Sequence, residues 1–269
     1  MTQGQGRLVI LNGPPRCGKT IAAEAIALLG KLPARAAAMT SGSPLSDGSP
    51  VVIHSSDELK RRTHLVYGLE ADLPPDAFEW CKDQPRVEFL GLTPRQAYIN
   101  CSNMFIAAHG DAVNGTFIAQ EMRRHGDAPL VLCGLGYNPE AAPVIKLVGA
   151  QNILLIRVHR FDADDNEFQF NDGRGWLDLP GIMTLDIENR GRDDFLVTAT
   201  AAADLFYRRE AISAAALNRR IQRIREAVCF LPDWPPGSMA SRAAHGITAG
   251  IGHIPQAAGA GMCPAPHPA

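Results

Sequence analysis

The sequence predicts an α/β fold in which parallel strands form a sheet with helices on both of its faces. Three short apolar runs, at 8–11, 129–133 and 152–157, are typical of strands that are buried on both sides. Segments rich in helix-forming residues separate these runs, as expected for strands that helical crossovers connect. A glycine-rich turn, 13–20, follows the first run directly. The chain is therefore expected to alternate between buried strands and covering helices.

Length and composition are those of a folded protein with a sizeable core. The chain has 269 residues, of which 46% are hydrophobic and 20% are charged, and these proportions exclude a disordered or collagen-like chain. No apolar run reaches the ~18 residues of a membrane span, and the first run is too short for the core of a signal peptide. The six cysteines include no Cys-x-x-Cys pair, so reduced thiols, a cytoplasmic location and no membrane partner are expected. The net charge of −2 gives no general attraction to a polyanion.

The first part of the chain is predicted to contain two strands and a block of helices. Strand 8–11 leads through the glycine-rich turn into a helix at 20–29, which Gly30 ends. The segment 31–50 is rich in Ala, Ser, Gly and Pro and is predicted to be a mobile loop before a second strand at 51–53. The block that follows is predicted to be helical, with helices at 56–67, 75–81, 94–109 and 113–124.

The second part is predicted to supply the remaining strands. Strands at 129–133 and 152–157 flank a predicted helix at 139–148. The last strands are predicted at 182–187 and 195–200, because both segments are short and apolar.

Three further segments complete the predicted organisation. The acidic and aromatic segment 161–175 is expected to form a lid over a site. A long helix predicted at 201–229 carries six arginines against three acidic residues, which favours a solvated face, with contact to nucleic acid as the alternative. Pro, Gly and Ala dominate 232–269, which is predicted to be a largely disordered tail, so the folded domain is expected to span 1–231.

One motif carries recognisable chemistry. The pattern Gly-x4-Gly-Lys-Thr is matched completely by Gly13, Pro14, Pro15, Arg16, Cys17, Gly18, Lys19 and Thr20. The turn lies between a predicted strand and a predicted helix, where backbone N–H groups can surround a triphosphate, and the two prolines restrict these contacts to the amides of 16–20. Lys19 is expected to neutralise the β- and γ-phosphates, and the Thr20 hydroxyl to bind Mg²⁺. The alternative is a chance glycine-rich turn.

Other nucleotide, metal and hydrolase motifs are not matched. Gly134 and Gly136 follow a strand, but Pro139 stands where a dinucleotide-binding loop requires its third glycine. The cysteines and the eight histidines lack zinc-ligand spacing, and the sequence contains no hydrolase nucleophile elbow. The glycine-rich turn is therefore the main functional signal.

Transfer of a phosphoryl group requires cations around that group and a segment that excludes water. Arg157 and Arg160, at the end of a predicted strand, and Arg174, in the lid-like segment, are candidates for this role. The alternative is that these arginines form surface ion pairs with Asp162, Asp164 and Asp165.

Three residues are candidates on the acceptor side of the reaction. Asp57 and Asp83 are candidates to bind an acceptor base or to activate its hydroxyl, although each is explained equally well as a helix cap. Arg95, which opens a predicted helix, is a candidate to hold an acceptor phosphate, with a plain surface position as the alternative.

Over about residues 7–200 the sequence resembles phage P-loop kinases related to deoxynucleoside monophosphate and thymidylate kinases. The resemblance implies a three-layer α/β/α fold with a mostly parallel five-stranded sheet, helical acceptor and lid insertions, and ATP with Mg²⁺ as the phosphoryl donor. It rests on the 13–20 turn, Leu59-Lys60, Lys82-Asp83, Gly91-Leu92-Thr93-Pro94-Arg95-Gln96, Tyr137-Asn138-Pro139-Glu140 and the arginine-bearing segment 157–174.

Within this family the sequence is most similar to a subgroup that phosphorylates 5-hydroxymethyluridine in phage DNA. This similarity implies modified DNA as the acceptor, with free deoxynucleoside monophosphates as one alternative and a P-loop NTPase that switches a partner as another. The arginines of 208–225 are candidates for contact with such DNA. One departure concerns Cys133-Gly134, because the family usually has an acidic residue there, so Glu140 or Asp57 would have to replace that Mg²⁺-associated carboxylate.

Overall fold

The computed structural model describes residues 6–28, 48–171, 173–228 and 234. Its strands are β1 (Leu8–Asn12), β2 (Val51–His54), β3 (Leu130–Cys133), β4 (Ile153–Arg160) and β5 (Met183–Asn189). Its helices are α1 (Lys19–Ala27), α3 (Asp57–Val66), α4 (Pro94–His109), α5 (Val113–Arg123), α6 (Asn138–Val148), α7 (Arg192–Tyr207) and α8 (Ala214–Val228).

The five strands form one sheet in the order β2-β3-β1-β4-β5, and every neighbouring pair is parallel. Leu8 of β1 pairs with Leu130 of β3 on one side and with Ile153 of β4 on the other. The carboxyl ends of the three central strands therefore lie at one edge of the sheet, which is where parallel α/β folds place their ligand sites.

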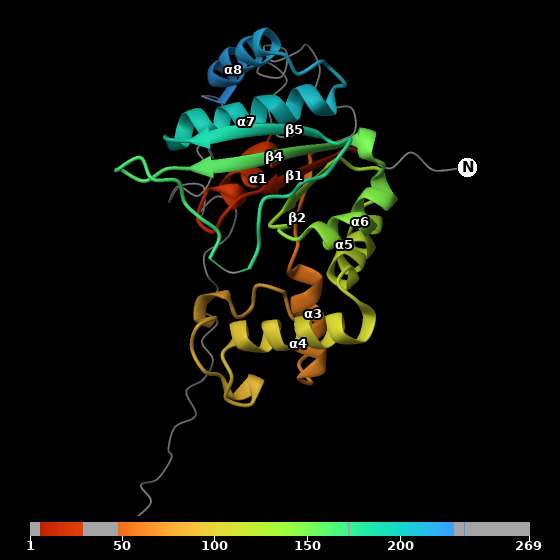
Figure 1. Ribbon diagram of the computed structural model, residues 1–269. Helices are drawn as coiled ribbons and strands as arrows, with labels where there is room; N and C mark the ends of the chain where they lie inside the picture. The colour runs from red at the N-terminus through yellow and green to blue at the C-terminus, as the bar shows by residue number, and fades with distance from the viewer. Residues whose placement is uncertain (1–5, 29–47, 172, 229–233, 235–269) are drawn as a thin grey trace, which may run out of the picture.

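Helices cover both faces of the sheet and produce three layers (Figure 1). The side chains of β1 alternate between the faces, so that Val9 and Leu11 pack with α1 and α7, while Leu8 and Ile10 pack with α5 and α6. Helix α8 lies outside α7 and adds Ile224 to the core on that side. The predicted three-layer α/β/α class with a five-stranded parallel sheet is confirmed.

Helices α3 and α4 form a separate lobe with the turns between them, beyond the edge where the parallel strands end (Figure 1). This α3–α4 lobe, residues 57–109, has an apolar cluster of its own, built on Phe78, Cys81, Phe89 and Ala97. The predicted helical insertion is thus present. Its predicted helix at 75–81 is wrong, however, because after Pro74 and Pro75 only turns and a single 3₁₀ turn, Glu79–Cys81, are formed.

Two predictions for the C-terminal part are wrong. The segment predicted as a strand at 195–200 lies inside α7. The alanine-rich run that follows it has a high helix propensity, and the helix includes both segments. The single long helix predicted at 201–229 is two helices, because α7 ends at Tyr207 and Arg209 adopts a left-handed conformation with φ of 61° before α8 begins.

Several predicted segments lie wholly or largely outside the described residues. These are most of the loop at 31–50 and the tail at 232–269, of which only Trp234 is described. Trp234 is partly buried and packs against the apolar cluster on the α7 side of the sheet. Within the part of the chain that the structure describes, no helix is long and apolar enough to cross a membrane.

Candidate functional site

The glycine-rich loop connects β1 to α1 at the carboxyl edge of the sheet. Gly18 has a φ of 107°, and a Cβ atom there would lie 2.8 Å from Nδ2 of Asn189. Both the backbone conformation and the close approach therefore require glycine at this position. Arg16 also has a left-handed backbone, with φ of 64°, so the loop turns back on itself before the helix starts.

Lys19 is buried at the start of α1, and its ammonium lies inside the loop. Its Nζ donates to the carbonyl oxygens of Gly13 and Pro14, both at 2.7 Å, and lies 3.5 Å from Sγ of Cys17. The first N–H groups of an α-helix have no acceptor within the helix, and the helix dipole adds positive potential at the same end. The structure thus brings the Lys19 ammonium and the first N–H groups of α1 to one point of the loop.

Thr20 is exposed in the first turn of α1, and its Oγ1 lies 3.9 Å from Sγ of Cys133 at the end of β3. Burial raises the pKa of Cys133 to about 11, against the opposing charge of Lys19, so the thiol is uncharged at neutral pH. Mg²⁺ prefers oxygen ligands and commonly takes several of them from phosphates and water. The Thr20 hydroxyl fits as one protein ligand for a nucleotide-bound Mg²⁺, whereas the Cys133 thiol does not replace a carboxylate.

The two acidic residues expected to compensate for Cys133 are held differently. Glu140 is buried in the first turn of α6, and its Oε1 accepts a hydrogen bond from Nδ2 of Asn114 at 3.1 Å. Burial raises the pKa of Glu140, and the Asn114 hydrogen bond and the Arg174 charge oppose this rise. Asp57 begins α3 just after β2, and burial raises its pKa against the charges of His54 and Lys60. Among the described residues, no group of three metal-binding side chains is found.

Arg160 and Arg174 both come to the edge that carries the loop. Nη1 of Arg160 donates to the carbonyl oxygen of Arg16 at 2.7 Å, and its guanidinium lies over the Phe168 ring at 5.1 Å. The Arg174 chain lies so close to Gly136, after β3, that a Cβ at that glycine would be 2.6 Å from Cδ of Arg174. The structure therefore brings two predicted arginines together around the carboxyl ends of β1, β3 and β4.

Arg157 does not join them. It is three residues before Arg160 on β4 and therefore lies on the opposite face of the sheet. There its Nε and Nη2 both donate at 2.8 Å to the carboxylate of Asp186 on β5. Asp165, one of the acidic residues expected to pair with these arginines, pairs with Arg190.

Arg95 and Asp83 meet on the α3–α4 lobe. Thr93 caps α4 by accepting from the Gln96 amide at 3.1 Å, which places Arg95 in the first turn of the helix. Nε of Arg95 lies 2.6 Å from Oδ1 of Asp83, and the two side chains are 54% and 65% exposed. The two residues therefore form an ion pair on the α3–α4 lobe, which is a different part of the fold from the glycine-rich loop.

Two asparagines of the site were not predicted. Asn12, buried at the end of β1, donates from Nδ2 to the carbonyl oxygens of Leu135 and Gly175, at 2.9 and 3.2 Å, and accepts from the Leu177 amide at 3.1 Å. Nδ2 of Asn189, at the end of β5, donates to the Cys17 carbonyl at 2.8 Å. A polar residue that ends a buried strand is the signal that could have identified Asn12. Asn189 carries no such signal, because β5 is largely exposed.

A cavity of about 280 Å³ adjoins the loop. Gly18 and Ile21 line it from α1, Arg160 and Phe161 from the end of β4, and Phe195 from α7. Its lining combines aromatic and aliphatic side chains with the polar side chains of Asn189 and Arg190.

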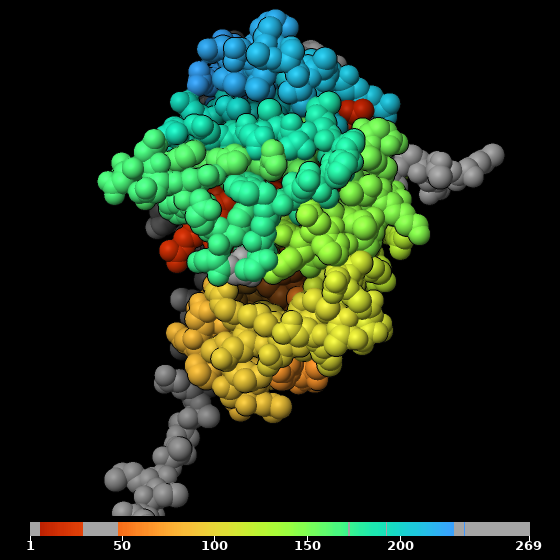
Figure 2. Space-filling model, in the orientation of Figure 1, coloured from red at the N-terminus to blue at the C-terminus, as the bar shows by residue number. Residues whose placement is uncertain are grey.

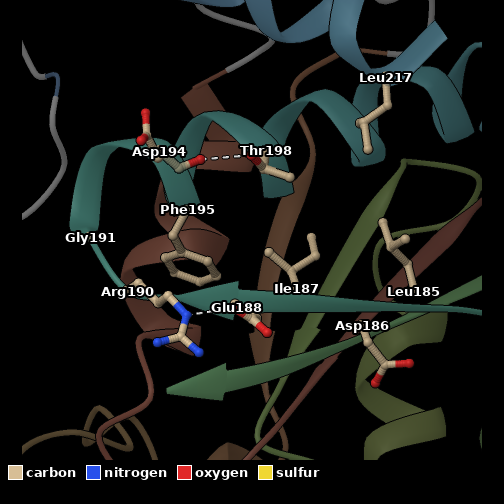
Figure 3. Close-up of a pocket in the computed structure, with 10 residues that line it drawn as sticks. All are labelled: Leu185, Asp186, Ile187, Glu188, Arg190, Gly191, Asp194, Phe195, Thr198 and Leu217. Atoms are coloured by element: carbon tan, nitrogen blue, oxygen red, sulfur yellow. Dashed lines mark hydrogen bonds and ion pairs between the residues drawn. The ribbon is translucent and has the colours of Figure 1, made fainter. Parts of the chain in front are cut away.

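A larger cavity of about 490 Å³ lies between β5 and α7 and is lined by no residue of the glycine-rich loop (Figure 3). Leu185 and Ile187 point toward α7 in this view, whereas Asp186 points away, to the other face of the sheet. The alternation on β5 therefore directs Leu185 and Ile187 toward α7, and Asp186 toward the charged face that carries Arg157.

Ion pairs engage Arg208, Arg220 and Arg225 in and before α8. Buried Arg220 binds Asp204 and donates to Oε1 and Oε2 of Glu210 at 2.8 and 2.9 Å. Arg208 donates to Asp204 at 2.8 Å, and Arg225 pairs with Asp194. Helix α8 also lies on the far side of the sheet from the α3–α4 lobe (Figure 1). The arginines of α8 therefore lie away from the α3–α4 lobe, and Arg219 and Arg223 among them are exposed.

Comparison of the chain with protein-family models and with curated proteins gives no match.

Proposed function

We propose that the protein is a P-loop kinase that transfers the γ-phosphoryl group of ATP to an acceptor. The observation that carries this proposal is the Lys19 ammonium, buried at the start of α1 and bonded to the carbonyls of Gly13 and Pro14. A cation and a helix N-terminus at one point, at the carboxyl edge of a parallel sheet, suit the triphosphate of a nucleotide.

In the proposed reaction, the bond from the γ-phosphorus to its bridging oxygen breaks, a bond to the acceptor oxygen forms, and ADP leaves. Lys19 and the loop amides stabilise the charge on the β- and γ-phosphates. Arg160 and Arg174 flank the group that is transferred. Mg²⁺ at the Thr20 hydroxyl would supply further neutralisation of phosphate charge. Asp57, whose pKa burial raises, is the candidate to accept the proton of the acceptor hydroxyl.

The cavity of about 280 Å³ beside Gly18 is the proposed position of the nucleotide base. It continues directly from the loop that would hold the phosphates, and Phe195 and Phe161 give it aromatic walls. Arg190 lies over the Phe161 ring at 4.1 Å and provides a further flat cationic surface there.

The acceptor is proposed to enter between the α3–α4 lobe and the sheet, where the space-filling view shows a hollow (Figure 2). Arg95, in the first turn of α4, half exposed and paired with Asp83, is the proposed ligand for a phosphate of the acceptor. The resemblance of the sequence favours 5-hydroxymethyluridine in DNA as this acceptor. A free deoxynucleoside monophosphate is the second candidate, because the arginines of α8 lie on the far side of the sheet from the α3–α4 lobe (Figure 1).

Binding of ATP and turnover in a Lys19→Ala variant test the proposed site. We expect wild-type protein with Mg²⁺ to bind ATP in calorimetry. The variant should lose at least about 10²-fold in turnover, because a fixed transition-state cation is removed. Lys146→Ala is the matched control, since Lys146 is an exposed lysine on α6. Failure of wild-type protein to bind ATP would contradict the proposal.

Labelled ATP distinguishes the acceptors. The protein is incubated with duplex DNA that contains 5-hydroxymethyluridine, with the same duplex containing thymine, and with free deoxynucleoside monophosphates. Label in the modified duplex alone supports the first acceptor, and label in a nucleoside diphosphate alone supports the second. Release of phosphate without a labelled product would point to an NTPase switch.

A further inference from the structure

His159, which precedes Arg160 on β4, lies between two carboxylates from different parts of the chain. Its Nδ1 is 2.6 Å from Oε1 of Glu167, and its Nε2 is 2.8 Å from Oδ1 of Asp186. Carboxylates accept hydrogen bonds but do not donate them when ionised. Both contacts are therefore hydrogen bonds only when both ring nitrogens carry a proton, which is the charged imidazolium form.

The residues after β4 gather on this ring. We term residues 161–171 and 173–176 the bridging segment. Trp176 stacks on the His159 ring with 4.3 Å between centroids and 24° between planes, and Phe170 contacts Trp176 edge-on at 5.2 Å. The Phe168 amide donates to the Arg160 carbonyl at 2.8 Å. Glu167 and Trp176, near the middle and at the end of the bridging segment, thus both contact one histidine.

Arg157 fixes the second carboxylate, that of Asp186. Asp186 accepts two hydrogen bonds from Arg157 at 2.8 Å, and the charge of Asp178 also acts on that arginine. Arg157 and His159 are two residues apart on β4 and share a face of the sheet with Asp186, the face that points away from α7 (Figure 3). The charged groups around the ring are therefore Glu167, Asp186 and, through Asp186, Arg157.

The same bridging segment carries the two arginines of the candidate site. Arg160 adjoins its start and bonds to the Arg16 carbonyl. Arg174 lies two residues before Trp176, and the next residue, Gly175, donates to the Gly136 carbonyl at 3.0 Å. A displacement of Trp176 from His159 would therefore displace Arg174 from the end of β3.

We propose that His159 is a positioning residue whose imidazolium fixes the bridging segment, and with it Arg160 and Arg174, beside the glycine-rich loop. The segment is held while His159 carries its charge and is released when the ring loses a proton. The consequence for nucleotide binding rests on the proposed function, whereas the hold on the segment does not.

The direction of the pH effect follows from the surroundings of the ring. Burial lowers the pKa of His159, but the hydrogen bonds and charges of Asp186 and Glu167 outweigh it and raise the pKa above its ordinary value. A histidine with a raised folded-state pKa stabilises its contacts fully below about pH 6.5. This contribution is lost as the pH rises through the raised value.

Hydrogen–deuterium exchange of the nucleotide-free protein tests the hold directly. Exchange of the bridging segment is compared at about pH 6 and about pH 8.5 after correction for intrinsic rates. In wild type we expect protection to fall about fivefold or more at the higher pH. His159→Gln should be poorly protected at both pH values. His125→Gln, which removes a histidine that lies 3.6 Å from Glu121 on α5, should behave as wild type.

Glu167→Gln provides a second, milder variant, because it keeps the ring and the shape of the segment but removes one charge. Its loss of protection should occur at a lower pH than in wild type. Equal protection and an equal pH response in wild type and His159→Gln would overturn the proposal.

A nucleotide-binding arm separates this proposal from the proposed function. The affinity for a fluorescent ATP analogue should weaken with rising pH in wild type and be weak at both pH values in His159→Gln. The predicted exchange pattern without any nucleotide binding would overturn the kinase proposal and support the role of His159. If wild type binds the analogue and His159→Gln shows unchanged affinity and unchanged exchange, the role of His159 is overturned and the nucleotide site of the kinase proposal is supported.

Discussion

His64 is a buried histidine that has no carboxylate partner among the residues that the structure describes. Its Nε2 lies 3.1 Å from the Tyr98 hydroxyl, and its Nδ1 is buried without a hydrogen-bond partner. The rings of Phe78 and Phe89 pack around it at centroid distances of 5.5 and 6.2 Å. Burial, and then the charge of Lys60, lower the pKa of His64. A proton on this ring is therefore unfavourable inside the α3–α4 lobe.

We expect the α3–α4 lobe to loosen in acid because of His64. The unfolded lobe takes up a proton at an ordinary pKa of about 6.5, whereas the folded lobe resists it. The unfolded state thus binds more protons, and the stability of the lobe falls as the pH drops below about 6.5. Hydrogen–deuterium exchange of α3 and α4 between about pH 7.5 and about pH 5.5 measures this loss. His64→Gln, which does not titrate, should show a much smaller response, and an equal response would contradict the assignment.

Single residues of the site differ in how far sequence alone could identify them. Lys19 and Thr20 follow from a local pattern, because the glycine spacing specifies the loop that presents them. His159 could not be identified in this way, because its partners Glu167 and Asp186 come together only after β4 and β5 pair. Asn12 gave a weaker signal, a polar residue at the end of an apolar strand, which local pattern cannot separate from a strand cap.

Helices α5 and α6 make a contact that depends on a glycine. A Cβ atom at Gly115 would lie 2.0 Å from the carbonyl oxygen of Glu140, far inside van der Waals contact with backbone. Next to this contact Asn114 donates to Glu140, and its Nδ2 also lies 3.0 Å from Ser102 Oγ on α4. The close approach therefore positions a polar connection between the α3–α4 lobe and the start of α6.

Gly115→Ala should destabilise the protein although alanine is the better helix former. Helix propensity favours alanine by about 1 kcal/mol, but overpacking against backbone costs about 1–3 kcal/mol or more. The overlap should dominate, since the Glu140 carbonyl cannot move without shifting α6. Denaturant unfolding measures the net loss. Gly175→Ala, where no atom lies within 4 Å of the added Cβ, is the control and should change stability by less than about 0.5 kcal/mol.

At the scale of elements, the prediction failed where local composition conflicts with the tertiary environment. The segment 195–200 contains Phe, Leu, Val and Thr, which favour a strand, yet it forms part of α7. Its buried positions contact α1 and the sheet, and the helix continues through the alanines of 201–203. Continuous buried runs such as β1 and β3 were predicted correctly because burial on both faces leaves the same signature in any parallel sheet.

At the scale of the whole molecule, an α/β core carries two further parts, the α3–α4 lobe and the bridging segment. Sequence predicted the core class and the helical insertion, because both depend on periodicity along the chain. It did not predict how the two parts are fastened, because each fastening joins residues that are far apart in sequence. The His64 and His159 environments are the clearest examples.

For the proposed kinase we expect activity to fall on both sides of neutral pH for two separate reasons. Acid charges His64 and loosens the α3–α4 lobe, while alkali discharges His159 and frees the bridging segment. Rate measurements across pH should show that His64→Gln extends activity toward acid. In His159→Gln the rate should be low and should no longer fall further as the pH rises. In the double variant the two effects should add, since the sites share no contact. Loss of both limbs in one single variant would contradict this separation.

The two carbonyl oxygens that accept hydrogen bonds from Lys19 set an energetic cost for any ligand that needs this ammonium. An incoming ligand has to draw the ammonium away from a place where it is already well solvated by the protein. A neutral nucleoside has no charge that attracts the ammonium, and each added phosphate increases the electrostatic attraction. For the proposed kinase we therefore expect affinity for the loop to rise from nucleoside to mono-, di- and triphosphate, because each added phosphate attracts the Lys19 ammonium more strongly.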